Sequence, residues 1–308
     1  MLHKSDLLYQ ENAQQNLKKG QVKDLVMQKL SQQHKKMSYK INHDNIQISF
    51  SGGRTSAFLL YKLLEANDCN LKNAKIIFTN TGREMEQTLD FIQECSERWN
   101  VQVVWLEYDI VNGKNSFKEV NHNSASRNGE PFEKIIDKYG RLPNALQRFC
   151  TGILKIQTAA KYLQTLNWKY WRNIIGIRYD EKKRMKQGLI NNWYYGLYPM
   201  VDAKHTLFDV DNFWSTQNFK LNLPIIKGNT VMGNCDMCFL KSESHLAMMM
   251  REYPEKAQWW IDMEKKTHKQ FNRDKNLIEF NNFIKSQKDW VFEQQGYFCQ
   301  ANQGDCTG

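Results

Sequence analysis

The chain has 308 residues, 41% of them hydrophobic and nine of them Trp, which predicts a globular protein with a full hydrophobic core. No apolar run approaches the length of a membrane span, and the first six residues lack the apolar core of a signal peptide, so we expect a cytoplasmic protein with no membrane partner. The net charge of +10 favours nucleotides, sulfonucleotides or nucleic acids as partners, although a solvated lysine-rich surface explains it equally well.

The order of expected elements divides the chain into three parts. Residues 1–40 are rich in Gln, Lys and Asn and form a polar N-terminal arm, whereas strands and helices alternate over 41–230. Residues 231–308 form a helical C-terminal region that carries a CxxC pair. We expect strands at 46–50, 74–79, 101–106 and 171–177, helices at 56–65, 85–99 and 153–166, and a polar loop at 109–130. This alternation predicts an α/β fold with a parallel sheet of about five strands and helices on both faces.

A glycine-rich hexapeptide follows the first expected strand and leads into the first expected helix. It reads Ser51-Gly52-Gly53-Arg54-Thr55-Ser56. Glycines let the backbone approach a phosphate, and the N-terminus of a helix adds N–H donors and partial positive charge. Arg54 adds a full charge, and the three hydroxyls can donate hydrogen bonds. The spacing is that of neither a Walker A loop nor a GxGxxG motif, and an ordinary tight turn is the competing interpretation.

The hexapeptide resembles the SGGxxS loop of the PP-loop ATP pyrophosphatases and of their relatives, the phosphoadenosine phosphosulfate (PAPS) reductases. Residues 79–91 look like the family's "DTG…ETL.F" segment, with Asn80 where Asp is usual. Residues 171–184 resemble its "GiR.dEs..R" segment. The resemblance implies an adenine nucleotide alpha hydrolase-like PP-loop fold. It also implies nucleotide contacts from Thr81, Gly82 and Arg178, and a guanidinium at a strand end suits bidentate capture of phosphate or sulfate.

Cysteines form the third group of candidate residues. The seven cysteines of a chain that looks cytosolic indicate thiols, metal ligands or redox groups before disulfides. Cys235 and Cys238 form a CxxC pair that can bind one metal or one corner of a cluster. We expect Cys69 and Cys95 to be ordinary buried cysteines.

Cys150 stands where the related adenosine phosphosulfate (APS) reductases have a Cys-Cys pair, with Phe149 at the first position of that pair. In that family the pair and a later CxxC hold a [4Fe–4S] cluster. The resemblance therefore implies a cluster on Cys150, Cys235 and Cys238, with Cys299 or Cys306 as the fourth ligand. A Zn²⁺ site and a redox dithiol are the alternatives.

Cys306 is also a candidate nucleophile. The ending Asp305-Cys306-Thr307-Gly308 resembles the Glu-Cys-Gly-x-His segment of thiol-dependent sulfonucleotide reductases, in which the Cys attacks sulfur. The His of that segment is absent here, and a reactive thiolate needs a nearby cation or helix N-terminus. This difference weakens the reductase interpretation.

The resemblance implies a nucleotide-dependent transferase that binds ATP with Mg²⁺ and cleaves it between the α and β phosphates. The reaction would adenylylate an acceptor for sulfur or nitrogen transfer, with the N–H groups of Gly52 and Gly53 and the charge of Arg54 stabilising the pyrophosphate. A nucleic-acid acceptor and a sulfur-donor protein are the partners that this family suggests. A PAPS or APS reductase and a catalytically silent nucleotide-binding protein are the alternatives.

Overall fold

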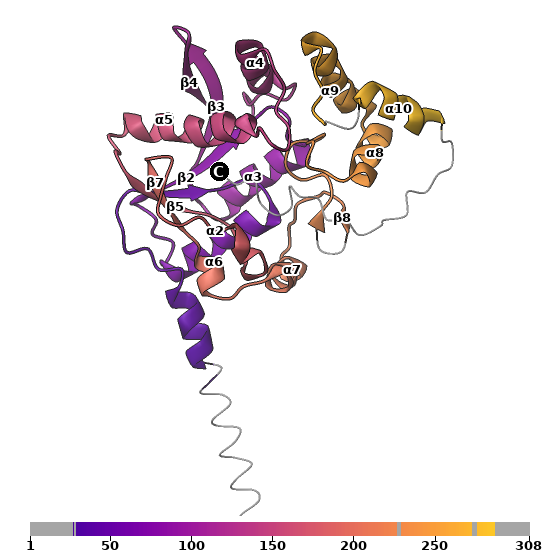
Figure 1. Cartoon of the computed structure of the whole chain (residues 1–308). Helices are drawn as coiled ribbons and strands as arrows, with labels where there is room; N and C mark the ends of the chain where they lie inside the picture. Colours follow the sequence, from indigo (N-terminus) through magenta and orange to yellow (C-terminus); the bar gives the residue numbers. More distant parts are fainter. Residues whose placement is uncertain (1–26, 28, 227–228, 273–275, 287–308) are drawn as a thin grey trace, which may run out of the picture.

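A seven-stranded sheet forms the centre of the molecule in this computed structural model, which describes residues 27, 29–226, 229–272 and 276–286 (Figure 1). The strand order is β4-β3-β2-β1-β5-β7-β6. The strands are β1 (Ile46–Ser49), β2 (Ala74–Asn80), β3 (Val103–Val111), β4 (Lys114–Val120), β5 (Trp171–Ile174), β6 (Leu189–Ile190) and β7 (Tyr194–Leu197). The five inner strands run parallel and both edge strands are antiparallel to their neighbours, which confirms the predicted α/β fold.

Helices lie on both faces of the sheet and continue into the C-terminal region (Figure 1). They are α2 (Arg54–Ala66), α3 (Glu86–Arg98), α4 (Glu130–Tyr139), α5 (Thr158–Thr165), α6 (Pro199–Asp202), α7 (Leu207–Thr216), α8 (Glu243–Glu252), α9 (Pro254–Thr267) and α10 (Leu277–Ser286). A 3₁₀ helix, η2 (Tyr179–Arg184), follows β5, and β8 (Ile225–Ile226) pairs antiparallel with β9 (Asn229–Thr230). None of the helices in the described ranges is long and apolar enough to cross a membrane.

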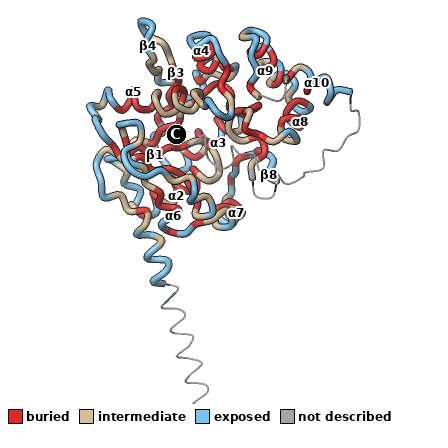
Figure 2. The backbone as a smooth tube through the Cα atoms, in the orientation of Figure 1, coloured by how far each residue is buried: buried red, intermediate tan, exposed pale blue. Residues whose placement is uncertain are grey.

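Burial explains why β1 occupies the middle of the sheet. All four of its residues are buried, as expected for a strand covered on both faces. Helix α2 packs one continuous apolar side, including Phe58, Leu59 and Leu63, into the same core. Figure 2 shows this core in red, while the helix over 29–37 is largely exposed.

The expected polar loop at 109–130 is wrong, because nearly half of it is strand: β3 continues to Val111 and β4 covers Lys114–Val120. Strand β4 forms a hairpin with β3 around Asn112 and Gly113, which have φ values of +51° and +72°. Asn-Gly is the preferred dipeptide of two-residue hairpin turns because both positions need a positive φ. Strand β4 was not predicted because it is a polar edge strand in which apolar and polar residues do not alternate.

The predicted helix at 153–166 is present, but its first part has an unusual form. Residues Thr151–Gln157 make a π-helix, η1, before α5 begins at Thr158. Such wide turns are rare and occur frequently at functional sites. This one starts directly after Cys150.

The C-terminal helices share one hydrophobic core with the sheet. Met249 and Trp260 are fully buried and belong to the same cluster as Ile48 and Leu59. Of the two cysteines expected to be buried, Cys95 is buried in α3, whereas Cys69 is exposed, which corrects the expectation. Cys69 has a φ of +58° and lies in the turn after α2, so its side chain has no core to enter.

The described end of the N-terminal arm is anchored in the core. The Tyr39 side chain is buried, and its hydroxyl lies 2.6 Å from Nδ1 of His205. Burial lowers the pKa of His205 to about 4, so the ring is neutral at physiological pH. Residues 1–26 and 28 of the predicted N-terminal arm lie outside the described residues.

Candidate functional site

The glycine-rich loop lies at the carboxyl end of β1, where ligands bind in open α/β sheets. Gly52 has a φ of +73°, and a Cβ there would come within 2.6 Å of Thr88 and 2.7 Å of Ile92. Gly53 is the N-cap of α2, and a Cβ there would meet only Ser51 Oγ, at 3.7 Å. Gly52 is therefore required by the fold itself, whereas Gly53 leaves backbone open to a ligand.

Two serine hydroxyls stabilise the loop internally. Ser56 Oγ donates to the carbonyl oxygen of Gly53 at 3.0 Å, and Ser51 Oγ donates to Ser56 Oγ at 3.1 Å. Ser56 is buried and holds the loop in shape, and its contact with a nucleotide stays a prediction. Thr55 stands in the first turn of α2 and contacts a residue from the other predicted anion motif.

That residue is Arg178, which brings the third family segment to the loop. Its Nη1 donates to Thr55 Oγ1 at 3.3 Å, and its side chain is 11% exposed. Asp180 and Glu181 hold the guanidinium, each with an oxygen 3.2 Å from Nη2. The two motifs, more than 120 positions apart in the sequence, thus meet at one edge of the sheet.

Arg54 points to a different partner from the one expected. Its Nη2 lies 2.7 Å from Oδ1 of Asp211, in α7, and its side chain is 10% exposed. Trp214 Nε1 in the same helix donates to the Arg54 carbonyl oxygen at 2.9 Å. Arg54 therefore fastens α7 to the start of α2, and its contact with phosphate stays a prediction.

The turn after β2 carries the second family segment. Gly82 has a φ of +77°, and a Cβ there would lie 3.0 Å from the backbone of Gly129. Its N–H donates to Asn80 Oδ1, and the Asn80 Nδ2 donates to Glu107 Oε1 at 2.7 Å. Glu107 is fully buried, so an Asp at position 80 would place a second carboxylate beside it. An amide at position 80 avoids that repulsion.

A buried carboxylate, Glu84, organises the same turn. It accepts hydrogen bonds from Thr81 N and Thr81 Oγ1 at 3.0 Å. Burial raises the pKa of Glu84, and the charge of Lys155 opposes that shift. The sequence analysis did not single out Glu84, although it lies inside the family segment.

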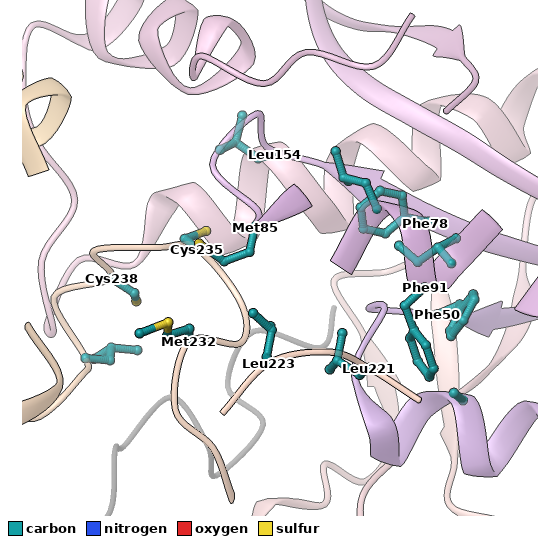
Figure 3. Close-up of a cluster of buried hydrophobic side chains, with 14 of the residues drawn as sticks. Phe50, Phe78, Met85, Phe91, Leu154, Leu221, Leu223, Met232, Cys235 and Cys238 are labelled. Atoms are coloured by element: carbon teal, nitrogen blue, oxygen red, sulfur yellow. The ribbon is translucent and has the colours of Figure 1, made fainter. Parts of the chain in front are cut away.

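Three cysteines converge on one cavity next to this turn. The cavity is lined by Thr81, Phe132, Arg148, Cys150, Thr151, Leu154, Lys155, Cys235, Cys238, Phe239, Leu240 and Trp260. Thr81 Oγ1 lies 3.5 Å from Cys235 Sγ, so the nucleotide segment touches the cysteine group. Figure 3 shows Cys235 and Cys238 at one end of the buried cluster, with Cys235 next to Met85. Cys299 and Cys306 lie outside the described residues.

The chemistry of this donor set fits a metal centre. Three thiols, two cationic side chains and apolar walls suit anionic thiolates and an iron–sulfur cluster. No three cysteine sulfurs among the described residues lie within 4.8 Å of one another. A tetrahedral zinc site, with Zn–S bonds of about 2.3 Å, holds its sulfurs about 3.8 Å apart. The three thiols would have to move closer together to bind one zinc ion, and both the zinc site and the cluster stay predictions.

Arg83 and Asp236 position the CxxC segment, and sequence reasoning missed both. Arg83 Nε donates to Asp236 Oδ1 at 3.3 Å, and both side chains are buried. Trp260 Nε1 also donates to that carboxylate, at 2.6 Å. The sequence signal for Asp236 was its place as a charged residue between the two cysteines of the CxxC pair.

Comparison with known proteins agrees with this geometry. The sequence model of the "Phosphoadenosine phosphosulfate reductase domain" family matches residues 45–222, which include the glycine-rich loop, the turn after β2 and Arg178. The chain belongs to this family. The match ends before the CxxC pair, so the cysteine centre draws on residues beyond the matched domain.

Three relatives of this PAPS reductase-domain protein cover much of its length. The "Uncharacterized nin region protein ORF290" of Escherichia phage lambda is 30% identical over 215 residues, which cover 67% of this chain and 69% of the phage protein. "Uncharacterized protein MJ0973" and "Uncharacterized protein MJ0066" of Methanocaldococcus jannaschii are 25% and 21% identical over 78% and 79% of this chain. The chain spans about half the length of both archaeal proteins, 51% and 46%.

Proposed function

We propose that this PAPS reductase-domain protein is a PP-loop transferase that uses ATP to adenylylate an acceptor for sulfur or nitrogen transfer. The observation that supports it best is the contact of Arg178 with Thr55, which brings the two predicted anion-binding motifs together. It lies next to Gly53, where the backbone is open to a ligand. In the reaction an acceptor oxygen attacks the α phosphorus, pyrophosphate leaves, and a sulfur or nitrogen nucleophile then displaces AMP. Mg²⁺ enters with the triphosphate as part of the substrate.

The residues of the loop would stabilise the leaving pyrophosphate. The N–H groups of Gly52 and Gly53 and the first turn of α2 provide fixed dipoles where charge develops, with no reorganisation during the reaction. Arg178 adds a guanidinium from the next strand end. Thr81 and Gly82 flank the same edge and would contact the base or ribose.

The cysteine centre would serve the sulfur chemistry. Cys150, Cys235 and Cys238 would hold an iron–sulfur cluster, with Cys299 as the proposed fourth ligand, because all three described thiols line one cavity with apolar walls. When bound, such a cluster would supply redox chemistry or carry sulfur. Thr81 supports a coupling of the two parts, because it contacts Cys235 from within the nucleotide segment.

Product analysis tests the reaction. The anaerobically purified full-length protein should release pyrophosphate from ATP when an acceptor is present, and a Gly53→Val variant should not. Release of sulfite from PAPS or APS without pyrophosphate would replace the proposal with the reductase alternative. Nucleotide binding without either product would identify a catalytically silent partner protein.

A further inference from the structure

The positive charge of this protein is concentrated in one segment. Residues 138–201 contain two carboxylates, Asp180 and Glu181. The cationic residues there are Lys138, Arg141, Arg148, Lys155, Lys161, Lys169, Arg172, Arg178, Lys182, Lys183, Arg184 and Lys186. The segment's net charge of +10 equals that of the whole chain, so the rest of the molecule is neutral overall. An anionic partner would therefore be drawn to this segment.

The segment builds one end of the molecule. It includes α5, β5, β7 and η2, which lie on the opposite side of the molecule from α8, α9 and α10 (Figure 1). Ion pairs with Asp180 and Glu181 hold Arg178 and Arg184 at the carboxyl edge of the sheet. The other end of β5 presents a different combination of side chains.

Aromatic and cationic side chains alternate at the amino ends of β5 and β7. We call Trp168, Lys169, Tyr170, Arg172, Trp193 and Tyr195 the aromatic–basic platform. Four of them, Trp168, Lys169, Tyr170 and Trp193, line a surface hollow that has no carboxylate among its described lining residues. Trp171 N donates to the Trp193 carbonyl oxygen at 3.3 Å, which fixes the two strand starts side by side.

The platform contains two cation–tyrosine pairs. Arg172 and Tyr195 are register partners on adjacent strands, and the guanidinium carbon lies 4.5 Å from the ring centroid. Lys169 Nζ lies 5.5 Å from the ring centroid of Tyr170. The tyrosines are 39% and 49% exposed, so their rings remain accessible for stacking.

We infer that the aromatic–basic platform binds a single-stranded nucleic acid. Accessible aromatic rings and cations around a hollow that no described carboxylate lines are the combination that stacks unpaired bases and neutralises phosphates. A duplex would use the charge but not the rings, because its bases are already stacked. This inference does not rest on ATP cleavage, since it concerns binding at the opposite end of β5.

Fluorescence anisotropy of the full chain with labelled oligo-dT, oligo-U and a matched duplex, over a range of salt concentrations, tests the inference. The Lys169→Gln/Arg172→Gln variant should lower the slope of log K against log salt by about 1.4 on single strands, since each lost phosphate contact contributes about 0.7. The Tyr170→Ser/Tyr195→Thr variant should bind at least about thirtyfold more weakly with the slope unchanged, since two stacking rings are lost.

A matched control changes two exposed lysines outside the segment. Lys72→Gln/Lys220→Gln removes the same charge and should leave affinity and slope unchanged. Circular dichroism melting checks that each variant is folded. If the double tyrosine variant does not fold, Tyr170→Ser alone replaces it, because Tyr170 precedes β5 and its change disturbs the sheet less. Equal affinity of the Lys169→Gln/Arg172→Gln variant and wild type, tighter binding to the duplex, or no binding by wild type would each overturn the inference. The relative affinities for oligo-dT and oligo-U identify DNA or RNA as the partner.

Discussion

Arg83 and Asp236 form a buried ion pair between the turn after β2 and the centre of the CxxC pair. Asp236 also accepts hydrogen bonds from Trp260 Nε1 and from the backbone N–H of Met237. The cysteines therefore approach the nucleotide segment on a rigid support. The pair also connects the matched family domain to the helices that follow it.

Removal of the Asp236 carboxylate should destabilise the protein. Asp236→Ala leaves Arg83 charged and buried without its partner, which costs about 3–5 kcal/mol of unfolding free energy. Urea denaturation measures the loss. Lys266→Met breaks the exposed pairs with Glu133 and Asp137 and should cost less than about 1 kcal/mol. Equal effects of the two substitutions would contradict the role of Asp236.

The two loop glycines should respond differently to substitution. Gly52→Ala should lower the unfolding free energy by about 2–4 kcal/mol, because its backbone is left-handed and its Cβ meets Thr88 and Ile92. Gly53→Val should keep the thermal stability but weaken nucleotide binding by at least about tenfold, or about 1.4 kcal/mol. Calorimetric titration with ATP tests this, and Gly53→Ala should give a smaller effect. Unchanged ATP affinity in folded Gly53→Val would refute the loop assignment.

Arg178 should contribute to nucleotide affinity through its charged donors. Arg178→Ala should weaken binding by about 1.5–3 kcal/mol, the value of a hydrogen bond to a charged group. Arg178→Lys should recover only part of this energy, because the planar fork is lost. Lys183→Ala removes an exposed cation nearby and serves as the control. If both alanine variants bind ATP equally well, Arg178 makes no phosphate contact.

Each single Cys→Ser substitution in the proposed cysteine centre should lower its iron content. Cys150→Ser, Cys235→Ser and Cys238→Ser should each lower the iron and sulfide content of anaerobic preparations, since all three thiols line one cavity. Cys69→Ser, at an exposed position, should leave the content unchanged. Cys299→Ser and Cys306→Ser then identify the fourth ligand. Iron content that is insensitive to Cys150 would remove it from the centre.

Stability should fall in mild acid because of His205. Its folded pKa of about 4 lies below the usual 6.5, so the unfolded chain takes up a proton first as the pH falls. The stabilisation from neutral His205 is complete above about pH 6.5 and is lost as the pH falls towards 4. At pH 5 the loss of unfolding free energy is roughly 2 kcal/mol. Urea denaturation of wild type and His205→Asn at several pH values gives the difference. Parallel pH profiles would show that another group is responsible.

The sequence predicted the parts of the site that depend on local spacing. The loop around Gly53, the turn at Thr81 and Arg178 follow strands whose apolar runs are evident, and parallel strands bring their carboxyl ends together. Partners distant in the sequence were not predictable. The ion pair of Arg54 with Asp211, 157 positions away, could be seen only in the structure, and the contact of Arg54 with phosphate stays a prediction.

Other differences arose from misread local signals. Strand β4 is polar because it lies at a sheet edge, so hydrophobic periodicity could not reveal it, although Asn112-Gly113 marked its hairpin. Cys69 was expected in the core on residue type alone, but the backbone turns at that position. Burial depends on where a residue falls within its element, which composition does not report.

The direction in which the Cys150 side chain points depends on the number of residues in the π-helix that follows it. Successive side chains of an α-helix are about 100° apart around the axis. Deletion of one residue within 151–157 would let the segment close into regular α-helix and would turn Cys150 by about that angle relative to the buried side of α5. The Cys150 thiol would then leave the cavity, although the lining residues outside the deleted segment would be unchanged. The wide turn thus decides whether the thiol of Cys150 faces the cavity.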